Sequence, residues 1–245
     1  MSILNVDYML GLFPILVSYL PLTLGMAAAG MVMALILSCC LAVIRVLRLP
    51  ILNGLTKLFI SFFRGTPLLV QLFLFYYGFP KLIADMAGVS VTILGHTTVL
   101  PMWLENATEI SAITAAIIGL TLHFSAYMAE SIRAAIVGVD RSQTEAALSI
   151  GMTNGQLMRR IVLPQATRIA VPTLMNYFID MIKATSLAFA LGVTELMGAT
   201  QKEAASSFNY FEAFITAAVL YWAVVELLAW LQRRLESRLN EAYRR

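Results

Sequence analysis

Long apolar runs alternate with short polar segments along this chain of 245 residues. A helix needs about 20 apolar residues, each rising about 1.5 Å, to cross the hydrocarbon core of a bilayer. No charged residue occurs in the stretch 8–44, which is longer than one crossing requires, and Pro14 and Pro21 divide it. We therefore expect an extracytoplasmic or interfacial helix within residues 1–19, followed by a first membrane span over about 21–44.

Four further apolar runs satisfy the same criterion for a span. The second span contains one charged residue, Arg64, near its start, and the third contains His123. The stretch 81–109 is a mixed loop with glycine, proline and acidic residues, and the stretch 192–210 predicts a polar loop. The four further spans cover about 58–79, 110–130, 169–191 and 211–231.

Composition agrees with a protein that is largely surrounded by lipid. Hydrophobic residues make up 60% of the chain and charged residues only 13%, whereas a soluble domain carries about 25% charged residues. The net charge of +3 gives a nucleic-acid partner no electrostatic support. The adjacent Cys39 and Cys40 lie in an apolar run and favour packing over thiol exchange, and no residue spacing predicts a metal site.

The distribution of positive charge predicts the orientation in the membrane. Cytoplasmic segments of membrane proteins carry an excess of Lys and Arg. The segments 45–57, 133–168 and 233–245 hold thirteen such residues, whereas the loops on the other side hold only Lys81 and Lys202. Because five spans place the chain ends on opposite sides, we expect an external N-terminus and a cytoplasmic C-terminus.

The predicted cytoplasmic segment 145–164 contains the signals of two short helices. The first helix ends at Gly151, a residue type that adopts the left-handed conformation common at helix ends. Asn154 and Gly155 predict a turn, and a second helix follows before Pro164, which breaks it or begins the next element. A plain amphipathic connector would contain the same helices, but it would not explain the spacing EAA, three residues, Gly, nine residues, Ile, one residue, Leu-Pro.

This spacing resembles the EAA loop of binding-protein-dependent ABC importer permeases, and every position of that pattern is met. The resemblance implies that the loop forms a pair of coupling helices that dock into a cleft on a separate ATPase subunit. Small alanines permit close packing there, and the glutamate offers a charge to the partner. The coupling residues implied are Glu145, Ala146, Ala147, Gly151, Ile161, Leu163 and Pro164.

Three further stretches resemble the branch of these permeases that takes up polar amino acids. Residues 61–72 (SFFRGTPLLVQL) are similar to its second-helix signature, residues 126–133 (AYMAESIR) to its AYxAExxR segment, and residues 183–187 (KATSL) to its KDTSL segment. Ala184 stands where that branch usually has aspartate. The resemblance leaves the substrate open among cystine, glutamine, basic and acidic amino acids, and we favour cystine or another polar amino acid.

The resemblance also implies an architecture and a set of partners. We expect an all-α integral membrane protein with the five transmembrane helices of the type I ABC importer (MetI-like) fold, in a domain over 20–232 followed by a cytoplasmic tail over 233–245. The expected partners are two ABC ATPase subunits, a second permease (self or paralogue), an extracytoplasmic amino-acid-binding protein and membrane lipid. The sequence contains no GxxxxGK[ST] phosphate loop, so we expect ATP and Mg²⁺ to be used by the partner ATPase. This chain would then bind no cofactor and would not itself be an enzyme.

Polar residues form a stripe on the third span and another on the fourth. Such residues are costly in lipid and therefore face protein or water, so two stripes on neighbouring spans predict a common lined cavity. An amino-acid substrate carries an ammonium and a carboxylate, which require at least an acid and a hydrogen-bond donor. The stripes are His123, Tyr127 and Glu130 on the third span, and Asn176, Asp180 and Lys183 on the fourth.

A structural interpretation competes with the substrate interpretation at several of these positions. Glu130 and Arg133 are three residues apart and can pair with each other, as can Asp180 and Lys183. Arg64 can instead hold a helix start or a lipid phosphate. The substrate-pathway candidates are Asn176, Asp180, His123, Tyr127, Thr66 and Gln71, and the structural or gating candidates are Arg64, Glu130, Arg133 and Lys183.

Two rival classes of function predict different behaviour. A free-standing carrier or channel would use intramembrane acids as a proton relay, and it would not form a stable complex with an ATPase. A thiol-exchange enzyme would need Cys39 and Cys40, so their replacement by serine would abolish its function. Neither class explains the spacing of the EAA segment.

Overall fold

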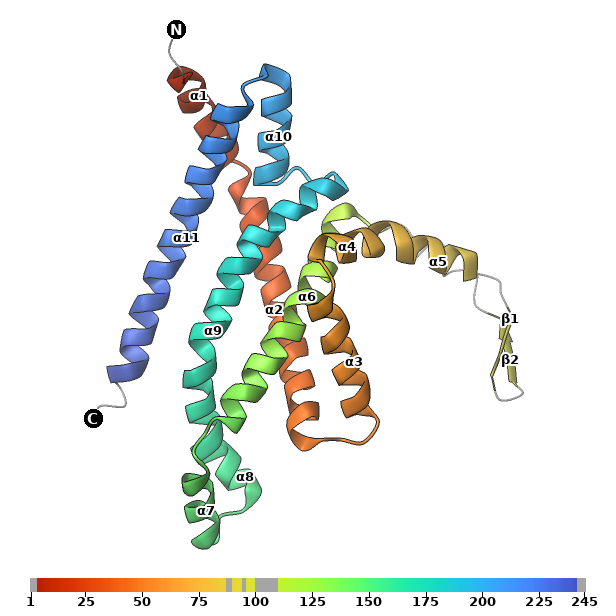
Figure 1. The fold of residues 1–245 in the computed structure, drawn as a ribbon, viewed down its shortest axis with the longest axis vertical. Coiled ribbons are helices and arrows are strands. Elements are labelled where there is room, and N and C mark those ends of the chain that lie inside the picture. Colours follow the sequence, from red (N-terminus) through yellow and green to blue (C-terminus); the bar gives the residue numbers. More distant parts are fainter. Residues whose placement is uncertain (1–3, 87–89, 94–95, 100–109, 242–245) are drawn as a thin grey trace.

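The computed structural model describes residues 4–86, 90–93, 96–99 and 110–241. Within these residues the chain is mostly helical, and several long helices run along the longest axis of the molecule (Figure 1). Four described helices are long and apolar enough to cross a membrane, and a fifth span results when the bent pair Asn154–Leu191 and Leu196–Ser207 counts as one. This agrees with the five spans expected. The four are Leu20–Leu47, Leu68–Met86, Ala112–Val137 and Tyr210–Ser237.

Three helices form the centre of the molecule, namely α2 (Leu20–Leu47), α6 (Ala112–Val137) and α9 (Leu163–Ala184). On α2, the small residues Ala27 and Ala34 are fully buried, and small side chains let membrane helices approach closely. Larger side chains of the other two helices fill the space beside them. These are Leu120, Phe124 and Met128 on α6, and Met181 and Ile182 on α9.

The second predicted span is not one continuous helix. α3 (Leu52–Gly65) ends at Thr66, whose backbone is extended (φ −119°, ψ 146°). Pro67 follows, and α4 (Leu68–Phe73) then starts in a new direction (Figure 1). Proline disfavours helical geometry in the residue before it and has no N–H to continue the hydrogen-bond ladder. The chain therefore turns inside the stretch 58–79, which its apolar pattern predicts as a single span.

Beyond this turn the chain continues through a π-helical turn, Leu74–Gly78, into α5 (Phe79–Met86). An antiparallel hairpin of β1 (Ser90–Ile93) and β2 (His96–Val99) comes next. The hairpin falls in the stretch 81–109, which the sequence predicts as a mixed loop. The expected all-α architecture thus holds for the spanning part of the molecule, with one small hairpin outside it.

A helix also occupies the stretch 192–210, where the prediction of a polar loop is wrong. After a 3-10 turn, Thr185–Leu191, the chain bends at Gly192, which is in the left-handed conformation (φ 86°), and α10 (Leu196–Ser207) begins at an angle of 51° to the preceding helix. Glu195 caps this helix by accepting hydrogen bonds from backbone N–H groups of its first turn. A polar composition is typical of both loops and capped helices, so composition alone could not separate them.

The last helix, α11 (Tyr210–Glu241), extends past the predicted span 211–231, so the described part of the tail continues this helix. α1 (Val6–Val17) is the short N-terminal helix that the sequence predicts, and it packs against α10 and α11. α1 and α10 lie at one end of the molecule, and α7 (Arg141–Ser149) and α8 (Asn154–Leu157) lie at the other (Figure 1).

Candidate functional site

The helices on both sides extend into the predicted cytoplasmic loop 133–168. α6 continues to Val137 and α9 begins at Leu163. The segment 138–162 between them contains α7 and α8. The motif residues from Glu145 to Ile161 therefore lie on a compact helical unit, which we call the coupling unit (residues 138–162), and Leu163 and Pro164 begin α9.

The first helix of the coupling unit has a cap at its start and a glycine after its end. The carboxylate of Asp140 accepts a hydrogen bond from the N–H of Ser142 at 2.9 Å. The backbone and side chain of Ser142 hold the pKa of Asp140 below its usual value, because both favour the charged carboxylate. Gly151 then adopts a left-handed conformation (φ 83°), as predicted. A Cβ atom there would meet nothing within 4 Å, so the backbone conformation alone favours glycine.

The turn predicted at Asn154 and Gly155 is wrong, because these residues begin α8. A capping box starts this helix: the hydroxyl of Thr153 accepts from the N–H of Gln156 at 3.3 Å, and Oε1 of Gln156 accepts from the N–H of Thr153 at 3.0 Å. Such reciprocal bonds satisfy donors that a helix start leaves free. The chain then passes through one π-helical turn into α9, where Pro164 lies in the first turn and begins the element.

The coupling unit packs as one body with the ends of α6 and α9. Ala147 is buried, with 3% of its surface exposed. The amide of Gln143 on α7 is 2.6 Å from that of Gln165 on α9. Because close-packed interiors deform little, a displacement of this unit would move both helices with it. The shared apolar core consists of Ala135, Val139, Ala147, Leu157, Val162, Ala166 and Ala170.

The outer face of the coupling unit is exposed. Glu145 and Ala146 face outward, and Ile150, beside Gly151, is 76% exposed. Apolar side chains grouped on a protein surface commonly mark an interaction site. Of the remaining motif residues, Ile161 packs against the core of the unit, whereas Leu163 and Pro164 are exposed.

Three of the predicted substrate-pathway residues meet at the turn between α3 and α4. The Gln71 side chain is 1% exposed. Its amide nitrogen donates to the carbonyls of Phe63 and Thr66, each at 3.0 Å, and to the Thr66 hydroxyl at 2.8 Å. Nδ1 of His123 lies 3.1 Å from the other amide atom, Oε1. These bonds fasten the turn to α6, so Gln71 and Thr66 hold the geometry of the broken helix.

Tyr127 and Arg64 continue this network toward the surface. The Tyr127 hydroxyl donates to the Arg64 carbonyl at 3.4 Å. The guanidinium carbon of Arg64 lies 5.3 Å from the centre of the Tyr127 ring, within the range of a cation–π interaction. A structural candidate and a pathway candidate are thus direct neighbours. They line a hollow of about 360 Å³ together with Ile60, Ser61 and Gly65.

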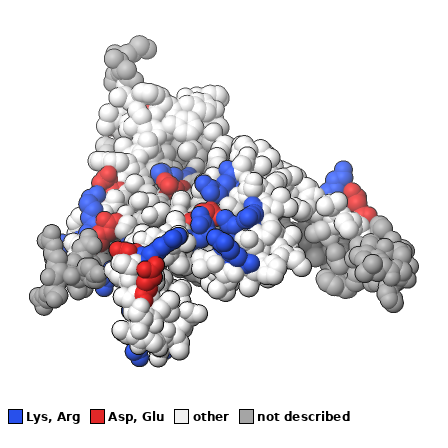
Figure 2. All heavy atoms as spheres, turned by 60° about the horizontal axis from the view of Figure 1, so that its bottom comes forward, with Lys and Arg blue, Asp and Glu red and all other residues white. Residues whose placement is uncertain are grey.

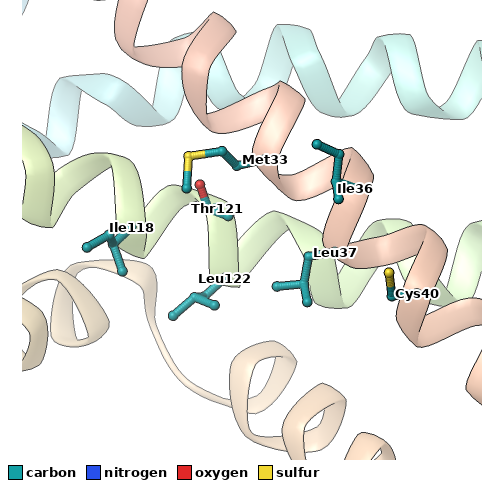
Figure 3. A pocket seen from close by; sticks show the side chains of 7 residues that line it. All are labelled: Met33, Ile36, Leu37, Cys40, Ile118, Thr121 and Leu122. Carbon is teal, nitrogen blue, oxygen red and sulfur yellow. The ribbon is translucent and has the colours of Figure 1, made fainter.

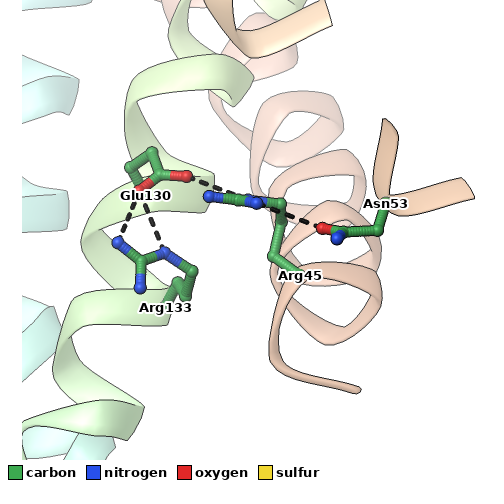
Figure 4. A network of polar contacts seen from close by, with 4 residues as sticks. All are labelled: Arg45, Asn53, Glu130 and Arg133. Carbon is green, nitrogen blue, oxygen red and sulfur yellow. Dashed lines mark hydrogen bonds and ion pairs between the residues drawn. The ribbon is translucent and has the colours of Figure 1, made fainter. Parts of the chain in front are cut away.

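Glu130 is the centre of a separate ionic network (Figure 4). One carboxylate oxygen accepts from Nη2 and Nε of Arg133, at 2.8 and 3.0 Å, which confirms the predicted pair. The other oxygen accepts from Nε of Arg45 at 3.2 Å, and Arg45 also donates to Asn53 at 3.1 Å. The sequence did not reveal the roles of Arg45 and Asn53, because Arg45 lies 85 residues from its acidic partner.

The polar stripe of α9 has different neighbours. Asp180 and Lys183 form an ion pair at 2.7 Å, as predicted, and both side chains are about half exposed. Asn176 accepts a hydrogen bond from Gln232 on α11 at 3.1 Å. On the α6 stripe, His123 contacts α4, Tyr127 contacts α3, and Glu130 bonds Arg45 of α2. The ring centres of Tyr127 on α6 and Tyr177 on α9 lie 6.2 Å apart, and the common cavity between the two stripes stays a prediction.

A fully buried carboxylate, Glu195, belongs to none of the predicted sites. It accepts hydrogen bonds from the N–H groups of Met197 and Gly198, at 2.8 and 3.0 Å. The hydroxyls of Thr23 and Tyr221 donate to its other oxygen, at 3.2 and 3.1 Å. Glu195 thereby joins α2, α10 and α11. Glutamate is not among the residue types preferred at helix N-caps, so the sequence carried no clear signal of this role.

An apolar hollow of about 390 Å³ lies between α2 and α6 (Figure 3). Cys40 lies on its wall, and the hydroxyl of Thr121 has no hydrogen-bond partner among the described residues. The lining contains no titratable group except the thiol, which favours a packing role for the cysteine over thiol exchange. The lining residues are Met33, Ile36, Leu37, Cys40, Ile118, Thr121 and Leu122.

Basic side chains gather on the end of the molecule that carries the coupling unit (Figure 2). Arg45 and Arg48 lie at the end of α2, and Lys57 lies near the start of α3. Lys202 lies on α10, at the opposite end (Figure 1). The charge asymmetry seen along the sequence is therefore also an asymmetry between the two ends of the folded molecule.

A family model described as "Binding-protein-dependent transport system inner membrane component" matches residues 30–241. The chain belongs to this family. This membership agrees with the predicted importer permease and gives no support to a free-standing carrier or a thiol-exchange enzyme. It also confirms that the chain is a membrane component with several spanning helices.

Curated relatives of this family resemble the chain over nearly its whole length. "Probable amino-acid ABC transporter permease protein PatM" of Vibrio harveyi is 58% identical over 97% of each chain. "Probable amino-acid permease protein YxeN" of Bacillus subtilis is 43% identical over 100% of each. "L-cystine transport system permease protein TcyL" of the same species is 39% identical over 93% of this chain and 88% of its own.

Solved structures of related transporters have the same fold. A structure titled "Crystal structure of an amino acid ABC transporter with histidines" matches with a TM-score of 0.81 and 28% identity, over 97% of this chain and 100% of that one. An inward-facing methionine ABC transporter, MetNI, matches with a TM-score of 0.72 and 19% identity, over 94% and 98%. These matches confirm the predicted MetI-like importer fold.

Proposed function

We propose that this chain is the permease subunit of an ATP-binding-cassette importer that carries polar amino acids into the cytoplasm. The observation that carries the proposal is the coupling unit, which has an exposed outer face with Glu145, Ala146 and Ile150 and a buried inner face packed on α6 and α9. In this proposal two ATPase subunits bind the coupling units of two permeases, self or paralogue. The ATPases bind and hydrolyse ATP with Mg²⁺, and an extracytoplasmic binding protein delivers the amino acid.

The orientation follows from the same end of the molecule. We place the coupling unit and the C-terminus in the cytoplasm and the N-terminus outside. Support comes from the basic side chains around the coupling unit (Figure 2) and from the preference of Lys and Arg for cytoplasmic segments. This orientation puts α1 and α10 on the side from which the binding protein approaches.

The mechanism is a conformational equilibrium that the ATPases bias. A ligand shifts such an equilibrium only if it binds the two states with different affinity. The ATPase cleft therefore contacts the coupling unit differently in the outward-open and inward-open states. The Gln143–Gln165 bond and the shared apolar core then carry the displacement to α9 and α6.

Cystine is the first substrate to test, because one relative is named an L-cystine permease. Asp180 and Lys183 supply one acid and one cation on an exposed face of α9, which matches the ammonium and carboxylate of an amino acid. Asp180→Asn should weaken uptake, whereas unchanged affinity and rate would remove Asp180 from the pathway. Thermal-shift screening of the associated binding protein with cystine, glutamine, arginine and glutamate identifies the cargo, because that protein largely sets selectivity.

The decisive test uses two glycines of the coupling unit. Neither Gly151 nor Gly155 has an atom within 4 Å of an added Cβ, but only Gly151 has a positive φ. Gly151→Asp must adopt a left-handed backbone that costs a non-glycine residue about 1–3 kcal/mol. Gly155→Asp adds the same side chain in the first turn of a helix, where an acid is favourable.

Transport is measured in proteoliposomes that contain the complete transporter, its binding protein and enclosed ATP. We expect Gly151→Asp to reduce uptake of labelled amino acid at least about tenfold, the effect of about 1.4 kcal/mol, and Gly155→Asp to leave it nearly unchanged. Normal uptake by a fully assembled Gly151→Asp complex would contradict the coupling role. Uptake that needs no ATP and stops with a protonophore would instead identify a secondary carrier.

A further inference from the structure

A second charged feature lies beside the coupling unit. A hollow of about 330 Å³ is lined by Arg45, Arg48, Asn53, Lys57 and Arg133. These residues come from the end of α2, the start of α3 and the last turns of α6. Four of the five are cationic and converge on one space. We call this space the basic hollow.

The cations of the basic hollow are only partly neutralised. Glu130 bonds Arg45 and Arg133, and it is the one carboxylate in the described network (Figure 4). Four cations and one carboxylate leave a formal charge of +3. Arg48 and Lys57 are exposed, and neither forms an ion pair with another described residue. Like charges held this close repel one another, so a bound anion would stabilise the arrangement.

The walls of the basic hollow are fixed before any ligand arrives. The two oxygens of Glu130 and the side chain of Asn53 hold the guanidinium groups of Arg45 and Arg133 in place. The α2–α3 connection contains Arg48 (φ 51°), one of the three described non-glycine residues with positive φ. A left-handed backbone is costly for such a residue and persists where surrounding structure or function requires it. Preorganised donors lose little freedom on binding an anion.

An exposed apolar surface adjoins the basic hollow along α3. Ile51, Leu52, Leu55 and Leu58 are 83%, 47%, 59% and 68% exposed, and Lys57 lies among them in the sequence. The basic hollow lies where spanning helices end, which is the depth of lipid headgroups. Basic pockets between membrane helices at this depth bind anionic headgroups.

We propose that the basic hollow binds the phosphate headgroup of an anionic phospholipid, whose acyl chains lie against the exposed apolar side chains of α3. The four cations recognise the phosphate, and the apolar residues distinguish a lipid from a free anion. Bound lipid would bridge α2, α3 and α6 directly beside the coupling unit. The proposal concerns a lipid site and is independent of which amino acid is transported.

The test uses the complete transporter in detergent, titrated with dioleoyl phosphatidylglycerol, and native mass spectrometry counts the bound lipid. The variant is Arg48→Gln/Lys57→Gln, which leaves the Glu130 ion pairs intact. The matched control is Arg233→Gln/Arg234→Gln, which removes the same charge from α11. Each cation near an anionic lipid contributes about a fivefold affinity, so we expect about thirty-fold weaker binding in the variant and no loss in the control.

Three further measurements separate the possible occupants. Dioleoyl phosphatidylcholine should bind wild type and variant equally. Inorganic phosphate at 10 mM, on the order of ten times the dissociation constant of a millimolar ligand, should not displace phosphatidylglycerol. Displacement by inorganic phosphate would overturn the lipid assignment in favour of a free anion. Equal phosphatidylglycerol binding by variant and control would overturn the site itself. Loss of the ATPase subunit from the variant with lipid binding unchanged would show instead that the basic hollow contacts that partner.

Discussion

Two carboxylates at opposite ends of the molecule are stabilised in opposite ways. Glu130, near the coupling unit, is 20% exposed and accepts hydrogen bonds from two arginines. Glu195, at the other end, is fully buried and is bonded by the hydroxyls of Thr23 and Tyr221 and by two backbone N–H groups. One is balanced by charge and the other by neutral donors.

The difference teaches what each end of the molecule requires. Burying a charge is costly unless it is paired or well hydrogen-bonded, and Glu195 meets the second condition by capping α10. Glu130 meets the first, and its partners belong to the basic end where water and ions have access. The stability of the Glu195 site should therefore depend on hydrogen-bond geometry, and that of the Glu130 site on charge and salt concentration.

Glu195→Ala should have the largest effect. It leaves Thr23, Tyr221 and the first turn of α10 without their acceptor, and unsatisfied buried groups cost about 1–3 kcal/mol each. We expect the free energy of unfolding to fall by about 3 kcal/mol. Tryptophan fluorescence of the purified transporter should show this as a lower unfolding temperature. Glu195→Gln keeps an acceptor for the helix and should lose far less. Equal unfolding of the two variants would contradict the capping role.

Glu130→Gln should come second. The neutral side chain leaves Arg45 and Arg133 without their anion, and hydrogen bonds to charged groups contribute about 1.5–3 kcal/mol. We expect the free energy of unfolding to fall by about 2 kcal/mol in low salt. Salt screens exposed charges, and in 1 M NaCl the Debye length is only about 3 Å. The difference in unfolding free energy between wild type and variant should therefore become smaller in 1 M NaCl. A gap that does not change with salt would show that charge is not what stabilises this site.

Tyr221→Phe tests one neutral donor of Glu195. It removes a single hydrogen bond of 3.1 Å and little else, so we expect a loss of about 1 kcal/mol. The same thermal measurement applies, and the effect should be insensitive to salt. A loss as large as that of Glu195→Ala would mean that the phenol, rather than the helix cap, dominates this site.

Asn53→Ala should have the smallest effect. Asn53 supports Arg45 from α3 through one partly exposed bond of 3.1 Å, so we expect about 0.5 kcal/mol. Combining it with Glu130→Gln measures their coupling in a double-mutant cycle. Strictly additive losses would show that the two residues do not act through the same arginine.

Several features of the fold could be predicted because their signals are local. The apolar stretch 8–44 and its prolines predict α1 and α2, and Gly151 predicts the end of α7. Two local signals can also predict different structures for the same segment. The apolar run 58–79 predicts one span, but the chain turns at Pro67; Asn154 and Gly155 predict a turn, but the capping box at Thr153 starts a helix there.

The candidate sites were predictable to different degrees for the same reason. The coupling residues follow a fixed spacing within 20 residues of chain, from Glu145 to Pro164. The pairs Glu130–Arg133 and Asp180–Lys183 were predictable because neighbours three apart meet on a helix. The polar stripes were correctly placed on their helices, but which helix each one faces depends on how the helices pack.

The sequence by itself determined the membrane class, the number of spans, the charge asymmetry and the coupling unit, because hydropathy, charge and motif spacing are properties of contiguous chain. Only the tertiary structure decided which distant polar groups meet. Glu195 is hydrogen-bonded to Thr23, 172 residues away in the sequence, and His123 to Gln71, 52 residues away. Such pairs depend on the angles and depths at which helices pack, and these are set by the side chains of the whole interface together.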